Sequence, residues 1–166
     1  KQGNDVRNNE EVLYNLGFDK IKEITGPRAL RFVKCELSDE MNEAGLLEKY
    51  KEDMIFRYAG GKNKNAWLPI SSCLPNHYYP DIWIANKAIK AIKELPETAP
   101  WILWISFVGP HEPFDTPEPW NKKNLEKNLE KPIKKSEWIK ELNIECNLKK
   151  KYESWKGRLK LEEIME

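Results

Sequence analysis

The chain has 166 residues and a formal net charge of +1, with 28 basic and 27 acidic residues interspersed along it. This balance argues against a surface that neutralises phosphates, so we expect no nucleic-acid partner. No stretch reaches the about 20 apolar residues needed to cross a bilayer, so we expect no membrane partner. The three cysteines lack C-x-x-C spacing, and neither a disulfide framework nor a zinc site is indicated.

The first predicted element is a helix from Asn9 to Leu16. Asn8 or Asn9 is suited to cap its start, and Gly17 is suited to end it. The segment 20–25 then alternates between polar and apolar residues, which is typical of a strand, before Gly26-Pro27 breaks the pattern.

A second helix is predicted to begin near Ser38, because Asp39 and Glu40 would interact favourably with the helix dipole. It is predicted to run to Gly60-Gly61. Its apolar residues fall on one face, which we interpret as a packing face. They are Leu46, Leu47, Tyr50, Met54 and Tyr58.

Residues 60–79 are predicted to form a long loop that contains His77. Loops of this length in compact domains are often functional. His77 is therefore a candidate for lining a substrate pocket. The alternative is a loop histidine whose hydrogen bonds are satisfied locally.

The clearest predicted helix runs from Pro80 to Glu94, with proline at the first helical position. Its predicted apolar stripe consists of Ile82, Ala85, Ala88, Ile89 and Ile92. The run from Trp101 to Val108 follows and is apolar on both faces, as expected of a strand in a parallel sheet covered by helices. Together they predict a helix–turn–strand unit of a doubly wound α/β fold.

His111 lies just beyond the end of this predicted strand. In open α/β sheets, ligands bind outside the carboxyl ends of the strands, so this is a favoured position for chemistry. Imidazole titrates near neutrality, which makes His111 a candidate catalytic acid. The alternative is a histidine that caps the strand end and is satisfied by Glu112 or Asp115, two acids that could instead orient the loop.

After Trp120 the composition changes to lysine, glutamate and asparagine, with Pro132 separating two segments. Apolar residues recur at helical spacing and predict a charged helical tail. They are Trp138, Leu142, Tyr152, Trp155 and Leu159.

Residues 106–120 read S-F-V-G-P-H-E-P-F-D-T-P-E-P-W. They closely resemble the segment S-F-x-G-P-H-x-P-[FWY]-D-x-P-E-P-[YW] of the sulfatases, in the alkaline-phosphatase-like superfamily. Residues 78–89 are similar to the helix that precedes this strand, and residues 16–19 with 23–28 resemble the segment upstream. The resemblance covers roughly residues 10 to 120, in the family's order.

The resemblance implies an alkaline-phosphatase-like doubly wound sheet with a helix-rich insertion and a C-terminal helical tail. It also implies hydrolysis of sulfate esters by a formylglycine made from the first residue of a C-x-P-S-R or S-x-P-S-R motif. Calcium is implied too, held by an Asp-Asp and an Asp-Asn pair. In this scheme His111 contacts sulfate or protonates the leaving group, an effect typically worth ~10²–10⁴-fold.

The motif and the acidic pairs are absent from this chain. Cys73-Leu74-Pro75-Asn76-His77 matches only the first part of the motif, and we interpret it as coincidence. We therefore expect the central part of a sulfatase, inactive by itself, that begins at Lys1 through trimming or a boundary. Residues 1–120 would belong to the catalytic domain, and 121–166 would form a charged helical segment or insertion. No metal ligand is assigned here, because formylglycine and calcium are expected in the full-length parent only.

The expected partners are the rest of the sulfatase chain and a small-molecule or glycan sulfate ester. A phosphate or phosphonate monoester hydrolase of the same superfamily remains an alternative. So does a non-catalytic module that kept the histidine and lost the site. The C-x-P-S-R motif in the parent reading frame would separate these. Both a periplasmic or secreted and a cytoplasmic location remain open.

Overall fold

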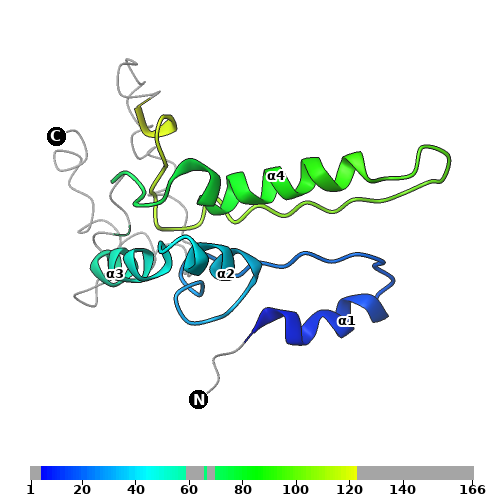
Figure 1. The fold of residues 1–166 in the computed structure, drawn as a ribbon, viewed down its shortest axis with the longest axis horizontal. Coiled ribbons are helices and arrows are strands. Elements are labelled where there is room, and N and C mark those ends of the chain that lie inside the picture. Colours follow the sequence, from blue (N-terminus) through cyan, green and yellow to red (C-terminus); the bar gives the residue numbers. More distant parts are fainter. Residues whose placement is uncertain (1–4, 59–65, 67–69, 123–166) are drawn as a thin grey trace, which may run out of the picture. The chain divides into compact units, whose positions relative to one another are not determined.

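The computed structural model of this chain describes residues 5–58, 66 and 70–122, and these are partly helical with almost no strand (Figure 1). The chain divides into two compact units, residues 1–121 and 122–166. Only Lys122 of the second unit is described, so the predicted tail helix lies outside the described residues. The β-structure of the described part is one bridge, between Asp5 and Lys34. The predicted doubly wound sheet is thus not formed within these residues.

The first predicted helix is confirmed as the 3-10 turn Val6–Asn9 followed by α1, Glu10–Asn15. Asn9 is the N-cap residue of α1, as predicted, although its side chain makes no capping hydrogen bond. The preceding 3-10 turn is capped by Asp5, whose side chain accepts a hydrogen bond from the backbone of Arg7 at 3.0 Å. Gly17 follows α1 with φ of +96°, a conformation that favours glycine at a helix end. The predicted strand over 20–25 is not formed, and that segment has no regular structure.

The predicted helix between Ser38 and Gly60 is divided into α2, Glu36–Glu43, and α3, Leu47–Tyr58. The break lies at Gly45, which adopts φ of +69°. The backbone N–H of Leu46 then donates to the carbonyl of Met41 at 2.8 Å, which closes the turn. The predicted helix end at Gly60-Gly61 lies outside the described residues.

The core lies where α2, α3 and the start of α4, Pro80–Lys93, come together. Its buried members are Leu30, Cys35, Leu37, Met41, Tyr50, Met54, Leu74 and Trp83. Trp83 of α4 donates from Nε1 to Glu40 of α2 at 2.7 Å, and Lys87 donates to Glu36 at 2.7 Å and to Glu40 at 2.8 Å. These contacts attach one face of α4 to α2.

The prediction that α4 begins at Pro80 is confirmed, but the predicted buried face is wrong. The buried residues of α4 are Pro80 and Trp83, both in its first turn, whereas Ile89 and Ile92 of the predicted stripe are exposed. The face of α4 that contains Ile89 and Ile92 is therefore not covered by the part of the chain that the structure describes.

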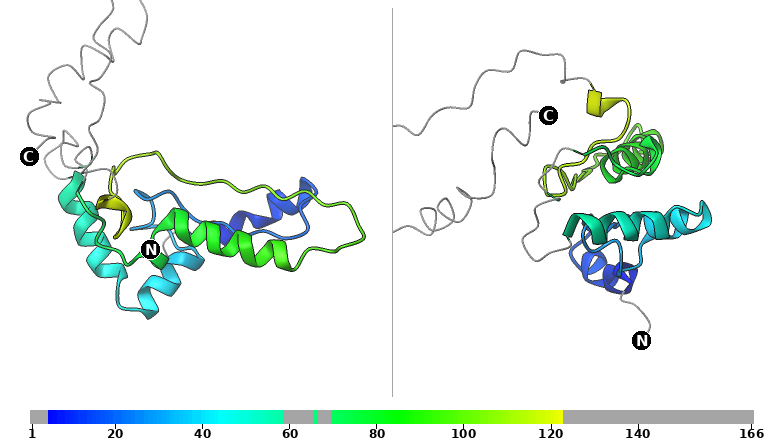
Figure 2. Two further views of the ribbon diagram at one scale, coloured as in Figure 1. Left: turned by 90° about the horizontal axis from the view of Figure 1, so that it is seen from above. Right: turned by 90° about the vertical axis from the view of Figure 1, so that its left-hand side faces the viewer.

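The segment Trp101–Val108 is not a strand in this structure, which corrects the prediction. It leaves the end of α4, turns, and runs back towards the start of that helix (Figures 1 and 2). Ile102 is 94% exposed, and Trp101, Trp104 and Phe107 are also exposed. The physical reason is that a strand needs a neighbour for its backbone hydrogen bonds, and no described segment pairs with this one.

Candidate functional site

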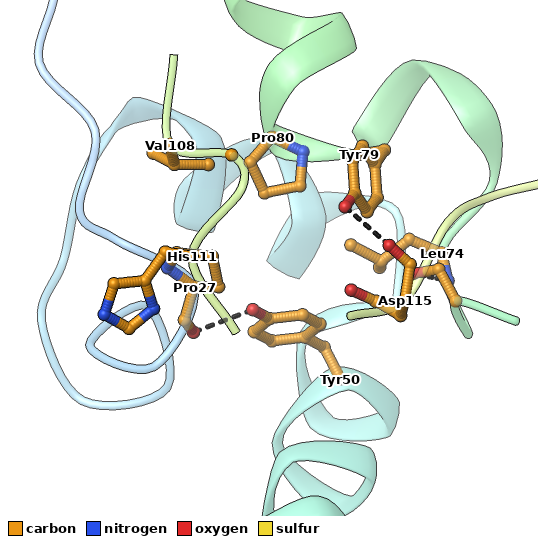
Figure 3. Close-up of a pocket in the computed structure, with 10 residues that line it drawn as sticks. Pro27, Tyr50, Leu74, Tyr79, Pro80, Val108, His111 and Asp115 are labelled. Atoms are coloured by element: carbon orange, nitrogen blue, oxygen red, sulfur yellow. Dashed lines mark hydrogen bonds between the residues drawn. The ribbon is translucent and has the colours of Figure 1, made fainter. Parts of the chain in front are cut away.

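A small pocket of about 10 Å³, room for roughly one water molecule, lies open to solvent where this segment meets the start of α4 (Figure 3). Segments far apart in the sequence contribute to it: the turn after Gly26, α3, the segment before α4, and the proline-rich segment after Val108. The lining residues with polar side chains are Tyr50, Ser72, Tyr79, His111 and Asp115. Folding thus brings His111 into a pocket with residues up to 84 positions away in the sequence, at Pro27.

The imidazole of His111 lies at the rim and is 59% exposed. Its Nδ1 is 2.8 Å from the carbonyl oxygen of Glu112 and 3.3 Å from that residue's carboxylate. A hydrogen bond from Nδ1–H to the carbonyl sets the tautomer and the ring orientation. Nε2 is then the nitrogen left to meet a ligand, since it forms no hydrogen bond within the described part of the chain.

Asp115 is buried and lies across the pocket from the imidazole (Figure 3). Its backbone carbonyl accepts a hydrogen bond from the hydroxyl of Tyr79 at 2.8 Å. Burial raises the pKa of the Asp115 carboxyl, while a hydrogen bond from Ser72 and the charge of Arg57 act in the opposite direction. The two acids after His111 therefore have different roles, because Glu112 orients the ring and Asp115 belongs to the pocket wall.

Tyr50 of α3 forms the floor of the pocket. Its hydroxyl donates to the carbonyl of Pro27 at 2.7 Å, which ties the Gly26-Pro27 turn to α3. Burial raises the pKa of Tyr50 above its usual value, which keeps the hydroxyl a hydrogen-bond donor to Pro27 even in alkaline solution. The sequence placed Tyr50 on a packing face, which is confirmed, but gave no signal of its place in the pocket.

Arg57 is the charged residue that the sequence reasoning missed. Its side chain is fully buried at the end of α3, and Nε is 2.6 Å from the carboxylate of Asp53. Nη2 donates to the carbonyl of Ser71 at 3.1 Å. The spacing of Asp53 and Arg57 on one helix face is visible in the sequence, but their burial depends on the fold.

His77 lies in the 3-10 turn Asn76–Tyr78 and is exposed, with its ring 4.2 Å from that of Tyr78. The structure does not bring it into the lining of the His111 pocket. The proposed substrate contact of His77 stays a prediction.

The residues that the structure describes contain no group of three or more His, Cys, Asp or Glu side chains that could hold a metal ion. They do not fit the calcium site that the resemblance implies, and we assign no calcium ligand to them. No helix in the described ranges is long and apolar enough to cross a membrane. No family model, curated protein or solved structure matches this chain.

Proposed function

We propose that this chain is the central part of a sulfatase and that His111 contacts the ester oxygen that leaves from sulfur. The observation that carries the proposal is the segment 106–120, whose histidine lies at the rim of a pocket with Nδ1 held by Glu112. The nucleophile and the calcium would be supplied by residues outside this chain.

His111 is suited to act on a leaving group. An alkoxide leaves poorly unless it is protonated or receives a hydrogen bond, and a protonated imidazole can supply both. Glu112 would stabilise the protonated ring through the contact of 3.3 Å, while Nε2–H would donate to the ester oxygen. His111 is the sole basic side chain among the described lining residues, so we assign only the leaving-group side of the site to this chain.

The exposed segment Trp101–Val108 also supports a larger fold. It is apolar on both faces, as a central strand of a covered parallel sheet would be, and α4 leaves Ile89 and Ile92 uncovered beside it. Strands and a helix layer from the rest of a sulfatase domain would cover both surfaces.

The first test is to sequence the parent reading frame and measure the intact mass of its product. A C-x-P-S-R motif upstream, with its cysteine about 18 Da lighter than encoded, is expected. A parent without that motif, or one with an unmodified cysteine, would contradict the formylglycine assignment.

The second test is a comparison of two substrates on the full-length parent and its His111→Ala variant. Phenyl sulfate has a more basic leaving group than 4-nitrophenyl sulfate, so it depends more on a proton donor. We expect kcat to fall about 10²–10⁴-fold on phenyl sulfate and clearly less on 4-nitrophenyl sulfate. Equal losses on both would refute the role of proton donor.

The same preparation separates the rival functions. Faster turnover of 4-nitrophenyl phosphate or phenylphosphonate than of the sulfates would favour a phosphate or phosphonate monoester hydrolase. No turnover of any of them would favour a non-catalytic module.

A further inference from the structure

The carboxylate of Asp81 connects the first turn of α4 to the segment that leads to His111. Its Oδ1 accepts a hydrogen bond from the backbone N–H of Val108 at 2.8 Å. Gly109 donates to both carboxylate oxygens, each at 3.2 Å. Asp81 thus holds the backbone at Val108 and Gly109. It does so from the first turn of α4, where the helix dipole favours a negative charge.

The hydrogen bonds continue from Asp81 to the histidine. The carbonyl of Val108 accepts from the backbone N–H of His111 at 3.3 Å, which closes a turn around Gly109 and Pro110. The carboxylate therefore holds the first two residues of the turn, and the turn sets where the backbone of His111 lies. Only then does Glu112 orient the ring.

Gly109 is needed for this contact. A Cβ at position 109 would lie 2.5 Å from Oδ2 of Asp81, closer than two such atoms can approach, and 3.6 Å from its Cγ. A larger residue would push the carboxylate away from the N–H groups that it accepts from. The hydrogen bonds of the Asp81 carboxylate therefore require a glycine at position 109.

We propose that Asp81 is a positioning residue for His111, acting through the backbone of Val108 and Gly109. The inference rests on the proposed function of His111. Asp81 is not placed to touch a substrate, because its carboxylate is occupied by the turn and it does not line the pocket. Its effect would be on the position of the imidazole, where a displacement of about 1 Å can cost about 10²-fold in rate.

Kinetics of the full-length parent on phenyl sulfate test the proposal. Asp81→Ala should lower kcat about 10- to 100-fold with little change in KM, and more on phenyl sulfate than on 4-nitrophenyl sulfate. Asp81→Asn, which keeps one acceptor oxygen of the same shape, should restore part of the rate. Glu48→Ala, in the exposed first turn of α3, is the matched control and should behave as wild type.

The His111→Ala background distinguishes positioning from general damage. If Asp81 acts through the imidazole, Asp81→Ala should cause little further loss when the imidazole is already gone. A similar loss of kcat in both backgrounds would overturn the proposal and assign Asp81 a purely structural role.

A double-mutant cycle between positions 109 and 81 gives an independent test. Gly109→Ala should lower kcat strongly when Asp81 is present, because of the clash at 2.5 Å, and much less in the Asp81→Ala background. Losses of kcat that simply add in the double variant would contradict a direct contact between position 109 and Asp81.

A spectroscopic readout covers the case in which the parent does not hydrolyse sulfates. Val108-Gly109 is the single Val–Gly pair of this chain, so carbonyl-labelled valine with ¹⁵N-glycine marks its amide. The Gly109 amide proton should be shifted downfield and exchange slowly in wild type, and lose both properties in Asp81→Ala, with a change in the His111 ring signals. An unchanged amide or unchanged ring signals would refute the positioning role whatever the enzyme does. An inactive wild type with the expected amide change would refute only the proposed function.

Discussion

Replacing Arg57 by methionine should destabilise the fold, because it leaves the carboxylate of Asp53 without its buried ion-pair partner. The guanidinium is fully buried, 2.6 Å from the carboxylate of Asp53, and its charge opposes the rise in the pKa of Asp115 that burial causes. Breaking a buried ion pair from one side typically costs about 3–5 kcal/mol, since the remaining charge has no partner. The Asp53 side chain is 19% exposed and would regain some water, so we expect about 3 kcal/mol.

The double variant Asp53→Asn/Arg57→Met isolates the charge effect. It leaves no unpaired charge at the position of the pair, so it should cost clearly less than Arg57→Met alone. Urea unfolding of the chain, followed by far-UV circular dichroism, measures both. A loss of about 3 kcal/mol corresponds to a midpoint lower by roughly 1–3 M urea.

The pH dependence gives a second check with a definite sign. Burial raises the pKa of Asp115 above 3.8, so Asp115 favours the folded state when it is protonated and opposes it as the pH rises through the raised pKa. Arg57 offsets this penalty only when Asp115 is charged. Arg57→Met should therefore cost more near pH 7 than near pH 4. A cost under about 1 kcal/mol, or an equal cost at both pH values, would refute the argument.

Two further predictions concern a turn and a thiol. Gly17→Ala should lower the free energy of unfolding by about 1–2 kcal/mol, because position 17 has φ of +96°. Gly26→Ala is the control: the position is equally open but has no positive φ, so the free energy of unfolding should change little. Equal effects of the two substitutions in urea unfolding would contradict this. Burial raises the pKa of Cys73 to about 11, so its alkylation by iodoacetamide should be slow at neutral pH and accelerate up to about pH 11. Neutral-pH alkylation as fast as that of a free thiol would show that Cys73 is not protected as described.

The elements that could be predicted are those with local signals. Pro80 starts α4 because its missing N–H costs nothing in the first turn, and Gly17 ends the α1 region because it adopts a positive φ. The same chemistry was overlooked at Gly45, where one predicted helix proved to be two. Helical periodicity across 38–58 masked the break, because Leu46 and Leu47 continue the apolar pattern on the other side.

The elements that failed depend on contacts with distant residues. An apolar run such as 101–108 indicates that the segment is suited to pack between other elements. It does not indicate whether those elements are present in this chain. The buried face of α4 likewise depends on which element packs against it. In this structure α2 packs against Trp83, which donates a hydrogen bond to Glu40, and not against the isoleucine stripe.

His111 lines a pocket at the end of the 101–108 segment, but the sheet edge at which it was predicted to lie is not formed in the described residues, so its catalytic role stays a prediction. The residues around His111 could not be inferred from the sequence. Tyr50, Arg57 and Asp81 each look like an ordinary helix residue when only the sequence is considered. Their roles arise from backbone carbonyls and N–H groups of other segments, which leave no trace in a side-chain pattern.

The uncovered segment at 101–108 also makes the chain vulnerable to aggregation. Eight residues without charge, rich in aromatic and branched side chains, are the type of sequence that pairs edge to edge with copies of itself. Pro100 and Pro110 bracket the run, and since proline donates no backbone hydrogen bond, they limit how far such pairing can extend along the chain. During synthesis, this exposed apolar run is a segment that a chaperone would be expected to bind.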